Sequence, residues 1–191
     1  MATLPKTHFT PEEYLELERK AESKSEYSNG EIFAMSGVGR KHDDIVAQLQ
    51  MLLGQHLRGG GCRTQTADLR VRVTPNDYVY PDLSVVCGKR QFADTHLDTL
   101  INPTLLVEVL SPTTERYDRG QKAYLYRRIE SLQQLLLISQ DEYSVELHTR
   151  QPDGSWVLKS FTGLDASVEL ASIGYTLHLR ELYERVIEDQ V

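Results

Sequence analysis

The chain has 191 residues and carries 28 acidic against 21 basic side chains, so its formal net charge is −7. Hydrophobic residues make up 40% and charged residues 26%, which is ordinary for a globular protein and excludes a disordered or collagen-like chain. No apolar run exceeds four residues, far short of the roughly 20 that span a bilayer, so we expect a soluble, cytoplasmic protein.

The first third of the chain predicts a helix, a hairpin and a second helix. Thr10-Pro11-Glu12-Glu13 is a capping box that begins a short helix through about residue 21. Asn29-Gly30 predicts a tight hairpin turn inside SEYSNGEIFAMS, because both positions tolerate a positive φ. Hydrophobic residues at helical spacing over 41–57 predict a core-facing helix: Ile45, Leu49, Leu52, Leu53 and Leu57.

The middle of the chain predicts buried strands around one helix. Alternation over 63–74 predicts a half-exposed strand, and Pro81 introduces the short buried strand DLSVVC. LLVEVL at 105–110, a helix over 114–129 and LQQLLLIS form a strand–helix–strand unit, whose crossover makes the two strands parallel. Cys62 and Cys87 are too few for a disulfide framework and lack zinc-site spacing.

The last 50 residues predict a hairpin of YSVELHT and SWVLKSF, joined by Pro152-Asp153-Gly154, and a short helix near 179–186. No linker or internal repeat interrupts the pattern. We therefore expect one mixed α/β domain over 1–191, with a central sheet flanked by helices.

Glu108 is the most informative residue, because it interrupts a strand whose other side chains indicate that both faces are covered. A buried ionised carboxylate costs several kcal/mol unless it is paired or binds a metal, and an ion-paired core glutamate is the equal alternative. Asp82 directly follows Pro81 at the head of another buried strand, although a Pro-Asp pair is by itself more typical of a turn.

The helix after LLVEVL carries Asp118, Lys122 and Tyr126 at intervals of four, so the three share one face. A solvated ion-paired stripe would explain that spacing. The helix must nevertheless pack on the sheet beside Glu108, which would bring Lys122 to the carboxylate. Two carboxylates and a lysine are the groups that metal-assisted phosphodiester hydrolysis requires, since hard oxygens hold Mg²⁺ and the lysine serves the attacking water.

These residues resemble the signature of the Uma-two family of endonucleases, within the PD-(D/E)XK or restriction-endonuclease-like superfamily. The resemblance covers roughly residues 8 to 140, the motif-bearing core, and leaves the C-terminal hairpin and short helix over 141–191. The matching residues are Pro81-Asp82, Glu108-Val109-Leu110, Ser111-Pro112-Thr113-Thr114, Asp118, Lys122 and Tyr126, with Glu26, Gly30-Glu31, Met35 and His42 upstream.

The resemblance implies a restriction-endonuclease-like fold and a Mg²⁺ or Mn²⁺ cofactor. Asp82 and Glu108 would be metal ligands, the Val109 carbonyl a third, Lys122 would serve the attacking water, and Glu26 would support it. The superfamily normally carries its lysine two residues after the glutamate, where this chain has Leu110, so the lysine would have moved to Lys122.

The sequence departs from the family pattern at two further places. Asn29 stands where an aspartate is usual, and Leu135-Leu136 replace a common aromatic pair. Neither change touches the expected ligands.

Other charged residues have ordinary explanations beside the functional one. An exposed hairpin charge explains Glu26 equally well, and a satisfied, semi-buried histidine explains His42 better than a metal ligand does. Arg63, Arg70 and Arg72 could contact phosphates from a strand, but solvated arginines are the commoner case.

We therefore expect a metal-dependent endonuclease that acts on nucleic acid, with DNA as the expected substrate, and that self-associates as a homodimer. The alternative is a nuclease-fold module without catalysis that has a binding or regulatory role. The net acidity and the absence of any obvious basic patch in the sequence favour that alternative somewhat, because a negative field repels phosphate backbones. The presence of all three residue types that the expected active site needs, an aspartate, a glutamate and a lysine, favours the enzyme.

Overall fold

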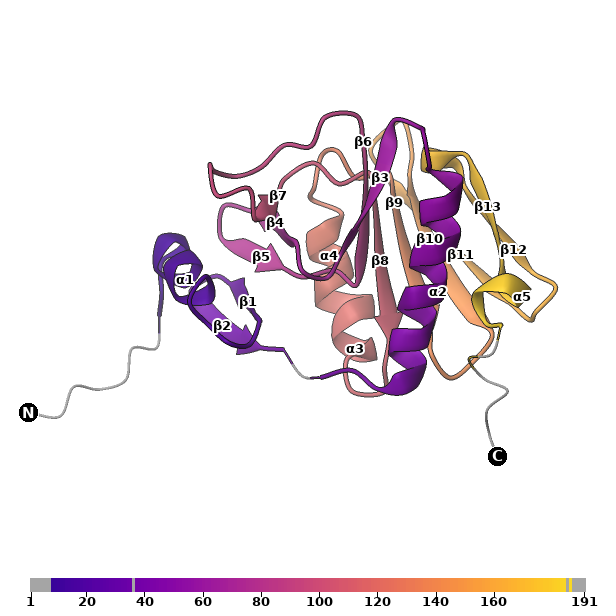
Figure 1. Ribbon diagram of the computed structural model, residues 1–191, viewed down its shortest axis with the longest axis horizontal. Helices are drawn as coiled ribbons and strands as arrows, with labels where there is room; N and C mark the ends of the chain where they lie inside the picture. The colour runs from indigo at the N-terminus through magenta and orange to yellow at the C-terminus, as the bar shows by residue number, and fades with distance from the viewer. Residues whose placement is uncertain (1–7, 36, 185, 187–191) are drawn as a thin grey trace, which may run out of the picture.

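The structure is a computed structural model that describes residues 8–35, 37–184 and 186. Two larger β-sheets and a small one make up the fold, with helices on both faces of the largest sheet (Figure 1). In the part of the chain that the structure describes, no helix is both long and apolar enough to cross a membrane.

A six-stranded mixed sheet forms the centre of the molecule, in the order β11-β10-β9-β8-β6-β3. Strands β8 and β9 run parallel and every other pair in this sheet is antiparallel, so the predicted crossover is confirmed. The bounds are β3 Cys62–Thr66, β6 Leu83–Cys87, β8 Leu105–Leu110, β9 Gln134–Ser139, β10 Ser144–Arg150 and β11 Trp156–Thr162.

Each face of this sheet is covered by a different helical segment. Helix α2 (Arg40–His56) packs Ile45, Leu49 and Leu53 against the odd-numbered residues of β8. The opposite face, with Leu106 and Leu110, packs against the segment after β8. That segment consists of α3 (Glu115–Tyr117), the π-helical turn η1 (Asp118–Lys122) and α4 (Ala123–Tyr126), so the helix predicted over 114–129 is shorter and contains a π turn.

A five-stranded sheet, β2-β1-β5-β4-β7, lies to one side with helix α1 (Pro11–Glu18) (Figure 1). Its β1–β2 hairpin turns at Asn29 and Gly30, both at positive φ, and α1 begins with the predicted capping box. The bounds are β1 Ser25–Ser28, β2 Glu31–Ala34, β4 Arg70–Thr74, β5 Asp77–Val79 and β7 Thr99–Leu100.

The expectation of one strand over 63–74 is wrong. The chain turns between Thr66 and Arg70, so β3 joins the central sheet and β4 joins the second sheet. The solvated role of Arg70 is also wrong, because this side chain is only 2% exposed and its Nη2 lies 2.9 Å from Asp98 Oδ2. Alternation marked Arg70 as opposite the apolar face but could not show that Tyr14 and Tyr80 cover it.

The C-terminal elements extend the first core. Strands β12 (Ser167–Leu170) and β13 (Tyr175–His178) pair with each other, around the 3-10 turn η2 (Ala171–Ile173), and α5 (Leu179–Leu182) follows. Their hydrophobic residues Val168, Leu177 and Leu182 belong to the same cluster as α2 and β8. This packing gives the six-stranded sheet a continuous hydrophobic layer on its α2 side.

Candidate active site

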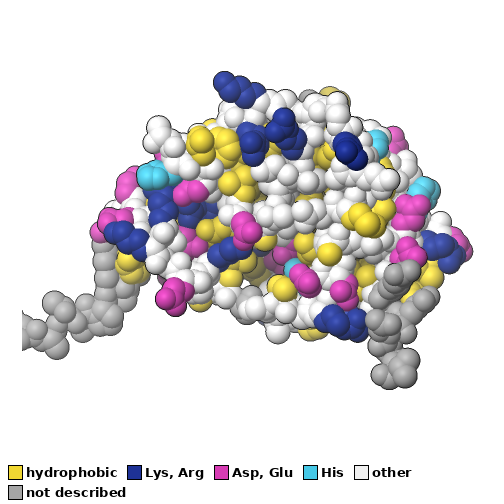
Figure 2. All heavy atoms as spheres, viewed as in Figure 1, with side chains coloured by type: hydrophobic (Ala, Val, Ile, Leu, Met, Phe, Trp, Pro, Cys, Tyr) yellow, Lys and Arg dark blue, Asp and Glu magenta, His cyan; other side chains and the backbone are white. Residues whose placement is uncertain are grey.

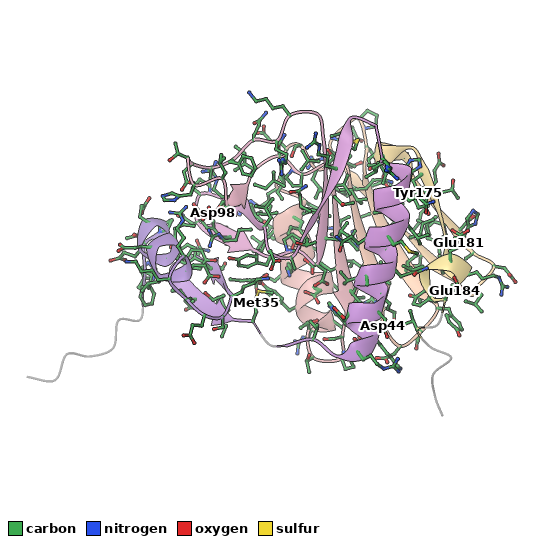
Figure 3. The ribbon with its side chains drawn as sticks, in the orientation of Figure 1. Met35, Asp44, Asp98, Tyr175, Glu181 and Glu184 are labelled. Atoms are coloured by element: carbon green, nitrogen blue, oxygen red, sulfur yellow. A yellow bond between two sulfur atoms is a disulfide. The ribbon has the colours of Figure 1, made fainter. Side chains whose placement is uncertain are left out.

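A cavity of about 620 Å³ opens between the two larger sheets. Its polar floor is formed by side chains from β1, α2, the start of β6, β8 and η1: Glu26, His42, Asp82, Glu108, Asp118 and Lys122. Its rim is more apolar and includes Phe33, Val38 and Met35, the last of which is labelled in Figure 3. Figure 2 shows this hollow in the lower part of the face, with acidic and histidine side chains inside it.

Glu108 and Lys122 form a buried ion pair on the cavity floor. Lys122 Nζ lies 2.9 Å from Glu108 Oε1, and the two residues are 5% and 3% exposed. The Tyr126 hydroxyl donates a short hydrogen bond to the same carboxylate oxygen. Because Asp118, Lys122 and Tyr126 all face β8, the predicted packing of this helical face against Glu108 is what the structure shows.

Asp82 is held beside Glu108 by the register of the central sheet. Leu83 pairs with Val107 in the antiparallel β6–β8 ladder, so continuing the ladder by one residue places Asp82 opposite Glu108. Asp82 Oδ2 accepts a hydrogen bond of 2.7 Å from the Val109 backbone N–H and lies 3.1 Å from His42 Nε2. These two contacts therefore fix the position of the Asp82 carboxylate beside Glu108 of β8.

Glu26 reaches the site from the second sheet. Its Oε1 lies 3.1 Å from Lys122 Nζ and accepts a 3.1 Å hydrogen bond from the Tyr80 backbone N–H. The Tyr117 hydroxyl donates to its other oxygen at 3.3 Å. Glu26 is buried, so the explanation of this residue as an exposed hairpin charge is wrong; the hairpin pattern could not show that side chains of α3 and η1 cover it.

The electrostatics of the floor are dominated by carboxylates. Burial raises the pKa of Glu108 well above its usual range; Lys122 opposes this shift, and the nearby charges of Asp82 and Asp118 add to it. Burial works to lower the pKa of Lys122, but Glu108, Glu26 and Asp118 outweigh it and hold this pKa well above its ordinary value. Lys122 is therefore an ammonium at neutral pH.

The donor set fits a divalent cation. Glu26, Asp82, Glu108 and Asp118 face a single lysine, Lys122, so carboxyl groups outnumber basic side chains on the floor. Across residues 8–35, 37–184 and 186, no three Asp, Glu, His or Cys side chains converge as a ready-made metal site. Mg²⁺ commonly takes only one or two protein carboxylates and completes its shell with water and phosphate oxygens, which two carboxylates satisfy.

Sequence reasoning named Asp82, Glu108, Lys122 and Glu26, and the structure brings all four to one cavity. The sequence did not predict the contact of His42 with Asp82, because a histidine on the apolar face of a helix is more typical of a core residue. His42 is buried, and its Nδ1 has no hydrogen-bond partner among the described residues. It also missed Tyr117, whose spacing places it off the face that carries Asp118 and Lys122.

Comparisons with known proteins agree on fold and family. Two uncharacterized proteins of Synechocystis sp., slr1290 and sll1609, are 39% and 33% identical to this chain, covering 95% and 85% of it and 94% and 92% of their own lengths. A crystal structure described as a putative nuclease belonging to DUF820, from Anabaena variabilis, superposes with a TM-score of 0.78 at 23% identity, over 94% of this chain and 99% of that one. This likeness confirms the expected mixed α/β, nuclease-type fold.

A family model places the chain more specifically. The model named Uma2, described as "Putative restriction endonuclease", matches residues 11–180. That range contains every residue of the cavity floor. The chain therefore belongs to the Uma2 family of restriction-endonuclease-like proteins.

Proposed function

We propose that this protein is a metal-dependent endonuclease that hydrolyses phosphodiester bonds of DNA. The observation that carries the proposal is the meeting of Asp82, Glu108 and Lys122 on the floor of one cavity, from three elements far apart in sequence. A purely structural ion pair would not need a second carboxylate beside it, since Asp82 raises the pKa of Glu108 and so opposes its ionisation.

Asp82 and Glu108 are the residues that would hold Mg²⁺ or Mn²⁺, with the Val109 carbonyl as a third ligand. When bound, the cation supplies neutralisation of the charge that develops on the phosphate and lowers the pKa of water. The contacts of His42 and the Val109 N–H with Asp82 fix the direction of that carboxylate. Tyr126 does the same for Glu108.

Lys122 would position the attacking water and stabilise negative charge in the transition state. Because the surrounding carboxylates raise its pKa, Lys122 would act as an ammonium that donates hydrogen bonds. Glu26, at 3.1 Å, holds the ammonium in place and is the supporting carboxylate nearest to it after Glu108. Lys122 and Glu26 together place a hydrogen-bond donor and a hydrogen-bond acceptor side by side at the cavity floor.

We further propose that the protein acts in the cytoplasm as a homodimer, since two copies related by a two-fold axis would present two centres to the two strands of a duplex. Light scattering on the purified protein tests the dimer. A mass of one chain, 21.8 kDa, across the working concentration range would contradict it.

Nicking of supercoiled plasmid tests the catalytic proposal. We expect open-circular product with Mg²⁺ or Mn²⁺, no product in EDTA, and loss of nicking in Asp82→Asn. Asp141→Asn is the matched control, because Asp141 is a more exposed aspartate outside the cavity. DNA binding without product under every metal condition would instead favour the alternative of a non-catalytic nuclease-fold module.

A further inference from the structure

A second cavity, of about 400 Å³, lies at the opposite end of β6 from Asp82. It is lined by three glycines and three basic residues, which we call the basic pocket: Gly60, Gly61, Arg63, Gly88, Lys89 and Arg90. No acidic side chain is among these lining residues. The pocket is therefore a local region of positive charge in a chain whose net charge is −7.

The walls of the basic pocket are two loops fastened together at the ends of β3 and β6. Cys62 and Cys87 are register partners, and Gly88 N–H donates a 2.7 Å hydrogen bond to the Gly61 carbonyl, so backbone contacts hold the two loops together with or without the disulfide between the two cysteines. Gly88 has a φ of +79°, a left-handed conformation that a glycine adopts without strain. The two loops are thus held at a fixed separation, and Lys89 directly follows Gly88 in the loop after β6.

Within the described residues, no carboxylate forms an ion pair with the basic side chains of this pocket, whereas several other arginines have such a partner. Arg19, Arg70 and Arg119 each lie within ion-pair distance of an acidic side chain. Arg63 and Lys89 are exposed and have no such partner among residues 8–35, 37–184 and 186. A rigid, concave and unneutralised group of cations is a site for anions.

Arg90, the third basic residue of the pocket, is not neutralised by its partners either. Its Nη1 donates a 3.1 Å hydrogen bond to the neutral Gln65 side chain, and its guanidinium lies over the Phe92 ring. Both partners are uncharged, so they orient the guanidinium without cancelling its charge. Arg90 therefore adds a held positive charge to the basic pocket.

The position of the basic pocket relates it to the candidate active site. Figure 2 shows Lys and Arg side chains gathered along the upper part of the face whose lower part contains the hollow. From Asp82 to Cys87 the chain advances five residues along β6, or about 17 Å at the rise of an antiparallel strand. That length equals the rise of about five base pairs of duplex DNA.

We propose that the basic pocket binds backbone phosphates of the DNA substrate about five base pairs from the bond that is cut, and so aligns the duplex along β6. The identity of this ligand rests on the proposed function, whereas the presence of an anion site rests on the basic pocket alone. The phosphate contacts hold the substrate in register and take no part in hydrolysis.

Anisotropy of a fluorescein-labelled DNA duplex, titrated with the full-length protein in Ca²⁺ over a series of NaCl concentrations, measures the contacts. Lys89→Ala should flatten the slope of log affinity against log salt by about 0.9, which corresponds to about eightfold weaker binding at 0.1 M salt. Lys159→Ala is the matched control, because Lys159 is an exposed lysine on β11, away from both cavities. Lys89→Ala should raise the plasmid concentration that gives half-maximal nicking, whereas Lys159→Ala should leave it unchanged.

Three results would overturn the inference. Equal slopes for Lys89→Ala and Lys159→Ala would show that the basic pocket contacts no DNA phosphate, even if nicking is normal. At matched ionic strength, inorganic phosphate could displace the duplex at a concentration far below the chloride concentration that displaces it. That result would identify a small-anion site instead. A lower nicking rate at saturating plasmid would place Lys89 in catalysis. The expected slope change in a protein that never nicks would support the inference while contradicting the proposed function.

Discussion

Replacing Lys122 by methionine removes the ammonium group that the carboxylates of the cavity floor surround, while keeping about the same side-chain volume. In the native protein, Lys122 Nζ lies 2.9 Å from Glu108, 3.1 Å from Glu26 and 4.0 Å from Asp118. All three carboxylates are nine-tenths or more buried. Removing one partner of a buried ion pair typically costs about 3–5 kcal/mol, so we expect Lys122→Met to lower the free energy of unfolding at pH 8 by about that amount.

The loss should depend on pH in a defined direction. The pKa of Lys122 is raised in the folded state, so its stabilising contribution is complete at neutral pH and disappears only as pH rises through that folded-state pKa. In Lys122→Met the buried carboxylates take up protons instead, and protonation relieves their repulsion as pH falls. The difference from the native protein should therefore be largest near pH 8 and shrink towards pH 5.

Urea unfolding at pH 8 and pH 5 measures the stability effect, and plasmid nicking in Mg²⁺ measures the activity. Nicking should fall by about 10²-fold or more, which is typical for loss of one group that stabilises transition-state charge. Leu110→Lys in the same background should partly restore it, since residue 110 shares the β8 face of Glu108. A variant that unfolds within about 0.5 kcal/mol of the native protein at pH 8 and nicks at the native rate would refute the reasoning.

Three further perturbations test other parts of the account. Divalent metal should raise the melting temperature of the native protein more than that of Asp82→Asn, and equal shifts would remove Asp82 from the ligand set. Hydrogen bonding to Arg19 holds the pKa of Asp98, labelled in Figure 3, well below its usual range, so the stabilisation by this carboxylate is present above about pH 4 and is lost as pH falls through the folded-state pKa. The urea midpoint of Asp98→Asn should therefore lie below that of the native protein at about pH 7 and approach it near about pH 2. A difference between the two midpoints that does not change with pH would contradict this. Leu49→Ala should cost about 2–5 kcal/mol in urea unfolding, against little change for the exposed Met51→Ala, and similar losses in both would mean that α2 is not packed as described.

Local sequence patterns predicted the central part of the fold well. The Asn29-Gly30 turn, the helical stripe of α2 and the parallel pair β8–β9 all follow from short-range rules that these segments obey. The convergence of Glu108 and Lys122 followed for the same reason, because a crossover helix must pack on the sheet beside its own strand.

Beyond its β1–β2 hairpin, the second sheet could not be predicted from the sequence. Strands β5 and β7 have three and two residues, too few to show any period, and they pair with segments distant in the chain. Alternation identified the polar face of β4 but not its cover, so the burial of Arg70 was missed. The division into a motif-bearing core over 8–140 and a C-terminal part stays a prediction, as do the catalytic roles of the site residues.

The most direct test of the central claim is the nicking rate of Glu108→Gln beside that of the native protein, in Mg²⁺ and with enzyme in excess over plasmid. Glutamine keeps the shape of Glu108 and its hydrogen bond with Tyr126, but it removes the negative charge that would hold the metal. The account predicts metal-dependent nicking by the native protein, at least about 100-fold slower nicking by Glu108→Gln, and no nicking by either in EDTA. Equal rates for the two proteins in Mg²⁺ would contradict the assignment of this cavity as the active site.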